Sequence, residues 1–324
     1  MVPQDNEFSN RTIYGVESAA LRYTWAGFLF FVIVSSLIGD TAILIASIKY
    51  RAFKLHKIII VIIQHIAVCD LMVSVADVFP NFASLLANKQ VFGDFLCYIS
   101  PYPRFYLTVA SVLLICTMTT SKLFTLKYPI RSRVISLKQM HLLCAVCWVV
   151  SFIVPVIFIC IDWHDVYFSF RIYQCSYGYS ADVYRKLKPI LVALFIFLPT
   201  CVVVTTTVLV LIIAKRVASR NRGSLKWQGI TTTVLTATIY CVSVLPVFLY
   251  AAGEGKVGGE KSSSFFHTYF YRIANLFLSL NTISNFYIYS LTVDSFRRFV
   301  RSPSHYRHSV NSSDIIRHGE TLFL

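Results

Sequence analysis

The sequence has little charge for its length. Only 14% of its 324 residues are charged and 56% are hydrophobic, whereas soluble domains have about 25% charged residues. The mean hydropathy is +0.64. This composition excludes an ordinary soluble domain and indicates a membrane protein.

Seven apolar segments account for this composition, and each is long enough to cross a hydrocarbon core of about 30 Å as a helix. They are predicted at roughly 25–48, 58–86, 97–121, 141–161, 188–214, 229–252 and 266–291. We therefore predict an all-α membrane protein, a seven-transmembrane helix bundle over residues 25–291. The flanking regions are an N-terminal tail (1–24), a short amphipathic eighth helix (292–301) and a disordered cytoplasmic tail (302–324).

Acidic residues are absent from three alternate loops. Lys49–Lys57, Lys122–His141 and Lys215–Gln228 together contain fourteen Lys and Arg residues and no Asp or Glu. Basic loops remain in the cytoplasm, so the amino terminus is predicted to be extracellular in a multi-pass plasma-membrane protein. The net charge of +15 gathers on the inner side. It therefore indicates contact with anionic membrane lipids and with an inner protein partner, not with nucleic acid.

Other absences narrow the function. Met1–Thr24 has no basic start and no apolar core, so the first helix is expected to act as the signal anchor. Residues 266–291 contain no Lys, which excludes a retinal Schiff base in the seventh span. Neither a metal-binding cluster nor a nucleophilic triad is visible, and we do not expect an enzyme. Asn10 begins a glycosylation sequon in the extracellular tail.

Four ionisable residues lie within the predicted spans: Asp40, Asp70, Asp77 and Arg104. A charge at bilayer depth costs about 2.5–3.5 kcal/mol on insertion scales, so such residues usually face the bundle interior and indicate function. Two structural alternatives remain open. Each side chain can be bonded to neighbouring polar groups, or a carboxyl can hold a proton.

The segment Ile66-Ala67-Val68-Cys69-Asp70 resembles the second-helix motif of the rhodopsin-like (class A) G-protein-coupled receptors. Further matches in order and spacing are Trp148 in the fourth span, Pro199 in the fifth, Pro246 in the sixth, the segment Asn281–Tyr289 in the seventh and Phe296 in the eighth helix. The resemblance covers about residues 25–300.

The resemblance implies a disulfide between Cys97 and Cys175. It also implies an allosteric sodium ion held by four residues. These are Asp70, Ser111, Asn281 and Asn285. A buried polar network without an ion is the alternative. Asp40 stands where the family usually has Asn, beside the second-helix carboxylate. Because two close carboxylates do not both ionise readily, one of them is expected to hold a proton. No other cofactor is expected.

The resemblance also implies a heterotrimeric G protein and arrestin as partners, yet the signalling motifs depart from the family. Ser121-Lys122-Leu123 replaces the usual Asp/Glu-Arg-Tyr, while Tyr289 of the seventh helix remains. Lys lacks the planar fork of donors that Arg presents. Other replacements are Thr207 for the fifth-helix Tyr, Lys226 for the inner sixth-helix acid, Val244 for the sixth-helix Trp and Phe286 for the seventh-helix Pro. An inner salt lock is therefore not expected.

The outer cavity is predicted to be basic. Arg104 lies seven residues after Cys97, where aminergic receptors carry an Asp. This charge argues against a cationic amine and favours a carboxylate or phosphate ligand. The predicted ligand-binding residues are Arg104, Phe105, Lys188, Tyr269 and Arg272. Alternatively, Arg104 pairs with an outer-loop acid such as Asp162 or Asp165, or extends outward.

Three alternative functions are consistent with these sequence features. The first is a receptor that transmits the binding of an extracellular ligand, a small organic anion or a peptide, to a G protein. The second is a binding-only decoy, which the altered Ser121-Lys122-Leu123 motif allows. The third is a cation- or proton-linked transporter using Asp40, Asp70 and Asp77, although no inverted repeat is visible.

Overall fold

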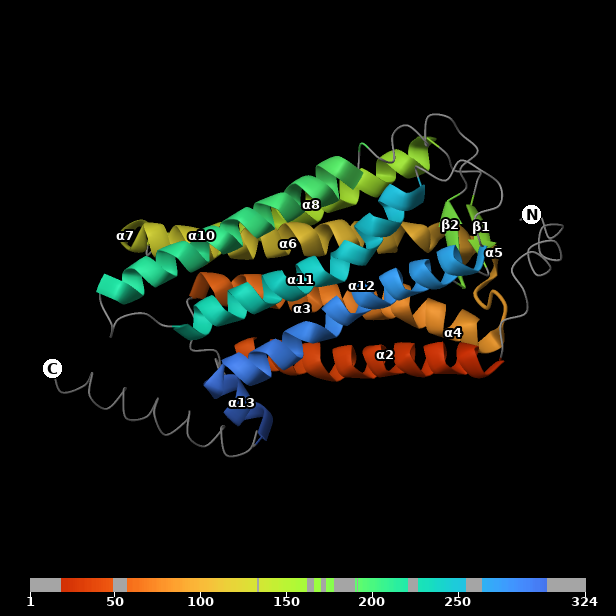
Figure 1. Ribbon diagram of the computed structural model, residues 1–324, viewed down its shortest axis with the longest axis horizontal. Coiled ribbons are helices and arrows are strands. Elements are labelled where there is room, and N and C mark those ends of the chain that lie inside the picture. The colour runs from red at the N-terminus through yellow and green to blue at the C-terminus, as the bar shows by residue number, and fades with distance from the viewer. Residues whose placement is uncertain are drawn as a thin grey trace.

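The computed structural model describes nine parts of the chain: 19–48, 57–132, 134–161, 166–169, 173–177, 190, 192–220, 227–254 and 264–301. Long helices run side by side in one bundle, and a small sheet lies at one end (Figure 1).

The first half of the bundle contains three long helical segments. They are α2 (Ala19–Ile48), the continuous run of α3 (Lys57–Val73), η1 (Ser74–Val78) and α4 (Phe79–Ala87), and the pair α5 (Gly93–Ile99) and α6 (Pro101–Lys127). The second half contains α7 (Pro129–Ser132), α8 (Leu137–Ile161), β1 (Val166–Ser169), β2 (Gln174–Tyr177), η2 (Ala193–Phe197), α10 (Leu198–Arg220), α11 (Trp227–Glu254), α12 (Ser264–Thr292) and α13 (Asp294–Arg301).

The helices have the lengths that a membrane requires. Within the described residues, five are long and apolar enough to span a bilayer: Ala19–Ile48, Lys57–Ala87, Gly93–Lys127, Ala193–Ser219 and Trp227–Leu249. A shorter apolar segment begins α8, and α12 has 29 residues. These seven segments form the predicted seven-helix bundle, which confirms the fold class. The first helix begins at Ala19, six residues before its predicted start.

Two π-helical turns widen the helices next to prolines. η1 ends two residues before Pro80, and η2 ends two residues before Pro199. Proline has no N–H, and its ring collides with the carbonyl four residues earlier. An extra residue in the preceding turn relieves this collision, and such π turns often lie at functional sites.

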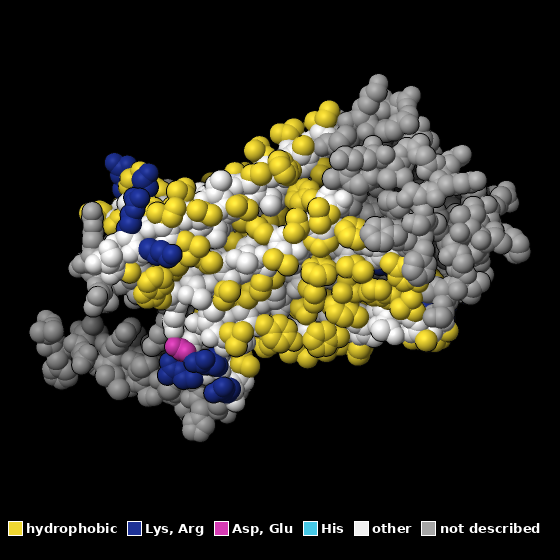
Figure 2. Space-filling view, viewed as in Figure 1, with side chains coloured by type: hydrophobic (Ala, Val, Ile, Leu, Met, Phe, Trp, Pro, Cys, Tyr) yellow, Lys and Arg dark blue, Asp and Glu magenta, His cyan; other side chains and the backbone are white. Residues whose placement is uncertain are grey.

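The centre of the bundle is the contact between α3 and α6. Ile62, Ile63, Leu114, Ile115 and Met118 are at most 1% exposed. Large apolar side chains such as Ile38 and Leu142 are instead exposed on the outer surface. This outward-facing apolar surface covers the middle of the molecule (Figure 2), as expected for helices in contact with lipid.

A histidine joins α3 to α8. The indole Nε1–H of Trp148 donates to His65 Nδ1 at 3.1 Å. Because an indole only donates, His65 carries its proton on Nε2 and can donate it to His141 Nδ1, 3.1 Å away. The family-typical Trp148 is thus positioned by a polar bond.

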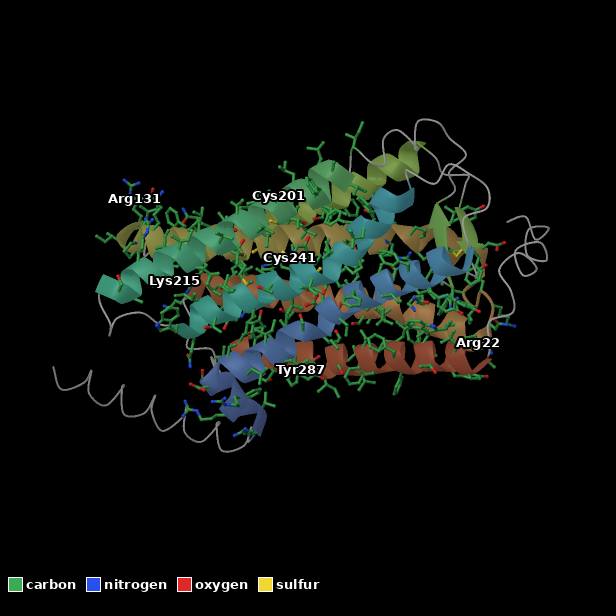
Figure 3. All side chains as sticks on the ribbon, viewed as in Figure 1. Arg22, Arg131, Cys201, Lys215, Cys241 and Tyr287 are labelled. Carbon is green, nitrogen blue, oxygen red and sulfur yellow. A yellow bond between two sulfur atoms is a disulfide. The ribbon has the colours of Figure 1, made fainter. Side chains whose placement is uncertain are left out.

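The two ends of the bundle differ. The hairpin end carries α5 and the antiparallel pair β1–β2, in which Phe168 is opposite Cys175. The basic end carries α7, the last turns of α10, and α13. Most of the visible Lys and Arg side chains lie at the basic end (Figure 2), including Arg131 and Lys215, whereas Arg22 lies at the hairpin end (Figure 3).

The eighth helix, α13, is amphipathic as predicted. Its Phe296 and Phe299 are buried, together with Val293 just before it, while Arg298 and Arg301 are exposed. Val300 is 38% exposed and does not belong to this buried face.

Candidate functional site

The predicted disulfide is present at the hairpin end. Cys97 in α5 is bonded to Cys175 in β2, with their Cα atoms 5.3 Å apart. Both cysteines are buried beside Val166, with Phe168 packed against them. The bond holds the hairpin over the start of α6 and so places Gln174, the residue before Cys175, above the helices.

Arg104 pairs with an acid inside the bundle. Its Nε donates to Asp77 Oδ1 at 2.8 Å, and both side chains are 21% exposed. Gln174 Nε2 donates to the same oxygen at 3.1 Å and to the Asp77 carbonyl at 3.2 Å. Asp77 belongs to η1, so this cluster joins the second span, the third span and the hairpin. The expected acid partners Asp162 and Asp165 lie outside the described residues.

A cavity of about 390 Å³ lies beside this cluster. It extends between η1, α4, α5, the start of α6, and β2, and Asp77, Arg104 and Gln174 are among its polar lining residues. Phe105 and Tyr269 are half-buried but do not line it.

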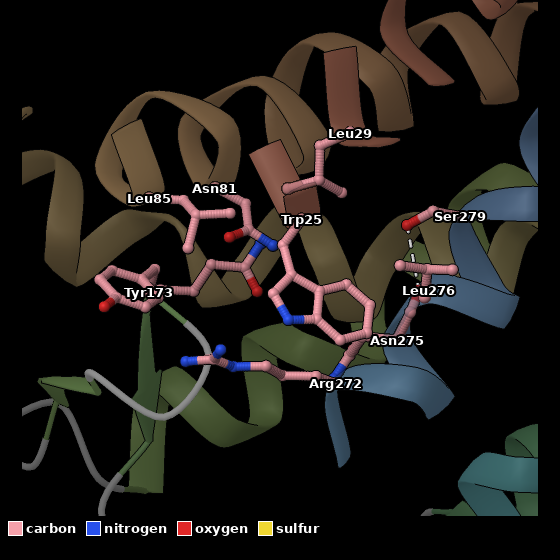
Figure 4. A pocket seen from close by; sticks show the side chains of 10 residues that line it. Trp25, Leu29, Asn81, Leu85, Tyr173, Arg272, Asn275, Leu276 and Ser279 are labelled. Carbon is pink, nitrogen blue, oxygen red and sulfur yellow. Dashed lines mark hydrogen bonds between the residues drawn. The ribbon is translucent and has the colours of Figure 1, made fainter. Parts of the chain in front are cut away.

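Arg272 lines a different and much smaller cavity, of about 40 Å³, between α2, α4, β2 and α12 (Figure 4). Its guanidinium carbon lies 5.3 Å from the centre of the Tyr173 ring. One water needs about 10–15 Å³ of such space, so this cavity has room for only a few waters. Tyr173 and Gln174 line both cavities. The structure therefore places Arg104 and Arg272 in separate cavities, while Lys188 lies outside the described residues, as does Asn10.

The middle of the bundle holds the predicted ion site. Asp70 is 1% exposed, and its Oδ2 accepts a hydrogen bond from Asn285 Nδ2 at 2.7 Å. Asp40 is fully buried and accepts from the Ser36 hydroxyl at 2.6 Å. The same hydroxyl lies 3.5 Å from the Asp70 carbonyl oxygen, so the two acids are neighbours.

Several buried oxygens of this region have no hydrogen-bond partner among the described residues: Asp40 Oδ1, Ser74 Oγ, Ser111 Oγ and Asn285 Oδ1. Buried polar atoms without partners are rare and often indicate a water or an ion. A hard cation prefers carboxylate, hydroxyl and amide oxygens, so this donor set fits sodium. Asn281 is also buried, and its carbonyl accepts from Ser284.

Ser74 was not predicted as a member of this site. It follows Asp70 by four residues, and residues at this spacing share one face of a helix. This four-residue spacing was the sequence feature that could have identified Ser74 as a member of the site.

We predict that sodium stabilises the protein through Asp70. Replacing KCl by NaCl at equal ionic strength should raise the Tm of the detergent-purified wild type by about 2–4 °C, because a ligand that binds only the folded state stabilises it. The Asp70→Asn variant should show no such rise. Ser151→Ala, a change at a buried serine of α8, is the control and should keep it. An equal rise in Asp70→Asn would contradict the site.

The predicted switch residues lie in the half of the bundle nearer the basic end. Lys122 is only 8% exposed and Tyr289 only 1%. Ser121 is half-buried, and its carbonyl accepts from Thr125 Oγ1 at 2.8 Å. Among the described residues, no carboxylate lies within 4 Å of the Lys122 ammonium.

The basic end has another connection between α11 and the end of α12. Gln228 Nε2 donates to Asp294 Oδ2 at 2.7 Å, and the Thr232 and Thr292 hydroxyls are 2.9 Å apart. Asp294 also pairs with Arg297. We call the contacts of Gln228 and Thr232 with Asp294 and Thr292 the α11–α13 clasp. It joins the sixth span to the start of the eighth helix. No sequence motif indicated this clasp.

Comparisons with known proteins agree with this architecture. A family model described as 7 transmembrane receptor (rhodopsin family) matches residues 41–289. The chain is 26% identical over 161 residues to the D(1A) dopamine receptor of Didelphis virginiana, covering 49% of this chain and 36% of that receptor. It is 20% identical over 162 residues to the octopamine receptor beta-1R of Drosophila melanogaster, covering 50% and 32%. It is 29% identical over 133 residues to the D(5)-like dopamine receptor of Takifugu rubripes, covering 41% and 28%. These alignments span about a third of each relative's length.

Proposed function

Because the chain belongs to the rhodopsin family of seven-transmembrane receptors, we propose that it transmits the binding of an extracellular ligand to a cytoplasmic heterotrimeric G protein. Membership of this family makes it a multi-pass plasma-membrane receptor and not an enzyme. The observation that carries the proposal is the family match over residues 41–289, together with a closed bundle that keeps Lys122 and Tyr289 buried near the basic end.

The hairpin end is proposed to be extracellular and the basic end cytoplasmic. A disulfide persists in an oxidising compartment, which favours the outside for the Cys97–Cys175 bond. Basic side chains are retained in the cytoplasm. Arg298 and Arg301 of α13 are then placed to attract anionic inner-leaflet lipids. Arrestin is proposed to bind the tail 302–324, which lies outside the described residues.

The proposed mechanism is a shift between two packed states of the bundle. A ligand moves this equilibrium only if it binds the active state more tightly. In the active state the basic end of α11 moves away from α12, and the opened cavity, with Lys122 and Tyr289 on its walls, receives a G-protein α subunit. The α11–α13 clasp opposes this movement and takes the place of the inner salt lock that the sequence lacks.

We predict that opening the clasp raises basal signalling. The Thr232→Val/Gln228→Leu variant loses two hydrogen bonds between α11 and the α12–α13 junction. Each is worth about 0.5–1.5 kcal/mol, so the loss of both should raise the ratio of active to resting receptor about five- to 150-fold. Basal second-messenger output at matched surface expression measures this.

The matched control is Thr238→Val, on the same helix. Thr238 is exposed and donates only to the carbonyl of Val234 in its own helix. Its replacement should leave basal output unchanged. Equal output from all three proteins, once coupling has been demonstrated, would show that the clasp does not hold the resting state.

The experiment that tests the function compares basal output from wild type and Lys122→Arg at matched surface expression. A wild-type signal that changes with the substitution supports contact between Lys122 and a G protein. Silence from wild type with a gain in Lys122→Arg indicates a receptor that awaits its ligand. Silence from both favours the binding-only alternative, for which the Ser121-Lys122-Leu123 motif is the supporting observation.

For the ligand we propose a small organic anion or the carboxylate of a peptide. The relatives are named as dopamine and octopamine receptors, but an amine would meet Arg104 where aminergic receptors carry an Asp.

Because Asp77 already accepts a hydrogen bond from Arg104, the ligand carboxylate has to replace the Asp77 carboxylate. Asp77→Asn should therefore increase the potency of anionic agonists about tenfold or more, and Arg104→Ala should abolish the response to these agonists. A screen in which Arg104→Ala leaves the potency of every anionic agonist unchanged would remove this ligand class.

A further inference from the structure

The cavity beside the Asp77–Arg104 pair lies at the hairpin end of the bundle. Its walls come from the second span, α5, the start of the third span, and the hairpin. At about 390 Å³ it is within the range of small-molecule sites, which are concave and mostly apolar with a few convergent polar groups.

One wall of this cavity continues into the surface that faces lipid. Val75, Phe79, Leu96 and Ile99 all line it, and their exposed fractions are 59%, 45%, 47% and 37%. In a bundle that spans the membrane, exposed apolar side chains at this position contact acyl chains. A molecule dissolved in the bilayer can therefore reach the cavity sideways.

Among the described residues that line the cavity, the charged side chains are one acid and one base, Asp77 and Arg104. Asp77 and Arg104 neutralise each other at 2.8 Å. Asp77 Oδ1 accepts from both Arg104 and Gln174, whereas Asp77 Oδ2 makes no hydrogen bond with the described part of the chain. The carboxylate thus keeps one oxygen able to accept a hydrogen bond on the cavity side.

We propose that this cavity binds an uncharged amphiphile from the membrane, a molecule with a hydroxyl head and an apolar chain. The hydroxyl donates to Asp77 Oδ2, and the chain lies against Phe79, Leu96 and Ile99. While Asp77 stays paired with Arg104, a charged head is disfavoured, because moving a charge into a mostly apolar cavity is costly and these two residues together supply no net charge. Binding leaves the Asp77–Arg104 pair intact and does not depend on coupling to a G protein.

The test uses a fatty alcohol that carries a diazirine in its chain. The full-length receptor is purified in lipid nanodiscs and irradiated with the probe, and the labelled peptides are identified by mass spectrometry. Labelling should concentrate on the peptides that contain Phe79, Leu96 and Ile99. The unlabelled alcohol should compete about tenfold better than the methyl ether or the fatty amine of equal chain length, because only the alcohol is both uncharged and able to donate to Asp77.

Leu96→Trp fills the cavity and should reduce this labelling about tenfold or more, and Val75→Phe is a second variant of the same kind. Leu86→Trp is the matched control, because Leu86 is similarly exposed, at 42%, but does not line the cavity. Labelling spread evenly over the lipid-facing helices would overturn the proposal. So would equal labelling of Leu96→Trp and Leu86→Trp, or equal competition by the ether or the amine.

Discussion

Arg104→Ala is expected to lower the free energy of unfolding by about 2–4 kcal/mol, one of the two largest effects of a single substitution that we anticipate. The substitution leaves Asp77 charged and mostly buried, and Gln174 is then its one remaining side-chain donor among the described residues. Removing one partner of a buried ion pair costs several kcal/mol, because the remaining charge loses its compensation. The Tm of the purified receptor in detergent measures the loss.

A double variant separates the ion pair from the general effect of truncation. Arg104→Met/Asp77→Leu removes both charges and keeps apolar volume, so it should be closer to wild type than Arg104→Ala alone. Arg298→Ala, at an exposed site on α13, should have little effect. If Arg104→Ala is no less stable than the double variant, the pair does not contribute to stability as argued.

Gly39→Ala should destabilise the receptor although alanine is the better helix former. A Cβ at Gly39 would lie 2.7 Å from Phe286 Cβ and 2.8 Å from Phe286 Cγ. Rotating the phenylalanine does not move its own Cβ, so α2 and α12 would have to separate. Overpacking of this kind costs about 1–3 kcal/mol, which exceeds the gain of about 1 kcal/mol from helix propensity. Thermal unfolding of the purified protein measures the difference.

Two further variants test this contact. Gly27→Ala is the control on the same helix, because nothing lies within 4 Å of its added Cβ, and it should be neutral or slightly stabilising. In a Phe286→Gly background the opposing Cβ is gone, so Gly39→Ala should cost nothing further. An equal penalty in both backgrounds would show that the loss arises elsewhere.

The Gly39 contact also explains a departure from the family. Phe286 occupies the position of the seventh-helix proline and packs on α2 at Gly39, with its ring centre 6.1 Å from that of Phe296 in α13. It thus connects three helices next to Asp40 and the candidate ion site. The sequence showed the replacement of proline, but the compensating glycine on another helix was visible only in the structure.

Much of the architecture follows from the sequence because the membrane restricts the secondary structures that a spanning segment can adopt. Backbone groups in lipid must be satisfied within a helix, so each long apolar segment has one accessible secondary structure. The Cys97–Cys175 bond was predicted through the family resemblance and is present. Asp70 and Asn285 were also predicted to meet, and they do so at 2.7 Å.

The partner of Arg104 could not be predicted in the same way. On a regular α-helix, Asp77 would lie about 20° around the axis from Asp70, seven residues earlier. The π turn Ser74–Val78 adds a residue and changes that angle, and Asp77 meets Arg104 on α6. Pro80 was the local signal for an irregular turn, but it does not specify which way the side chains of that turn face.

The sequence by itself determined the number of spans, the family, the asymmetry of charge between the two ends, and the buried acid at the centre of the candidate ion site. These depend on local composition and on motifs within single helices. Only the tertiary structure decided that Asp77 neutralises Arg104, that Arg272 lies in a separate cavity against Tyr173, and that the α11–α13 clasp joins two helices at the basic end. Each of these contacts joins segments far apart in the chain, and their geometry depends on helix rotation and close packing, which no local pattern encodes.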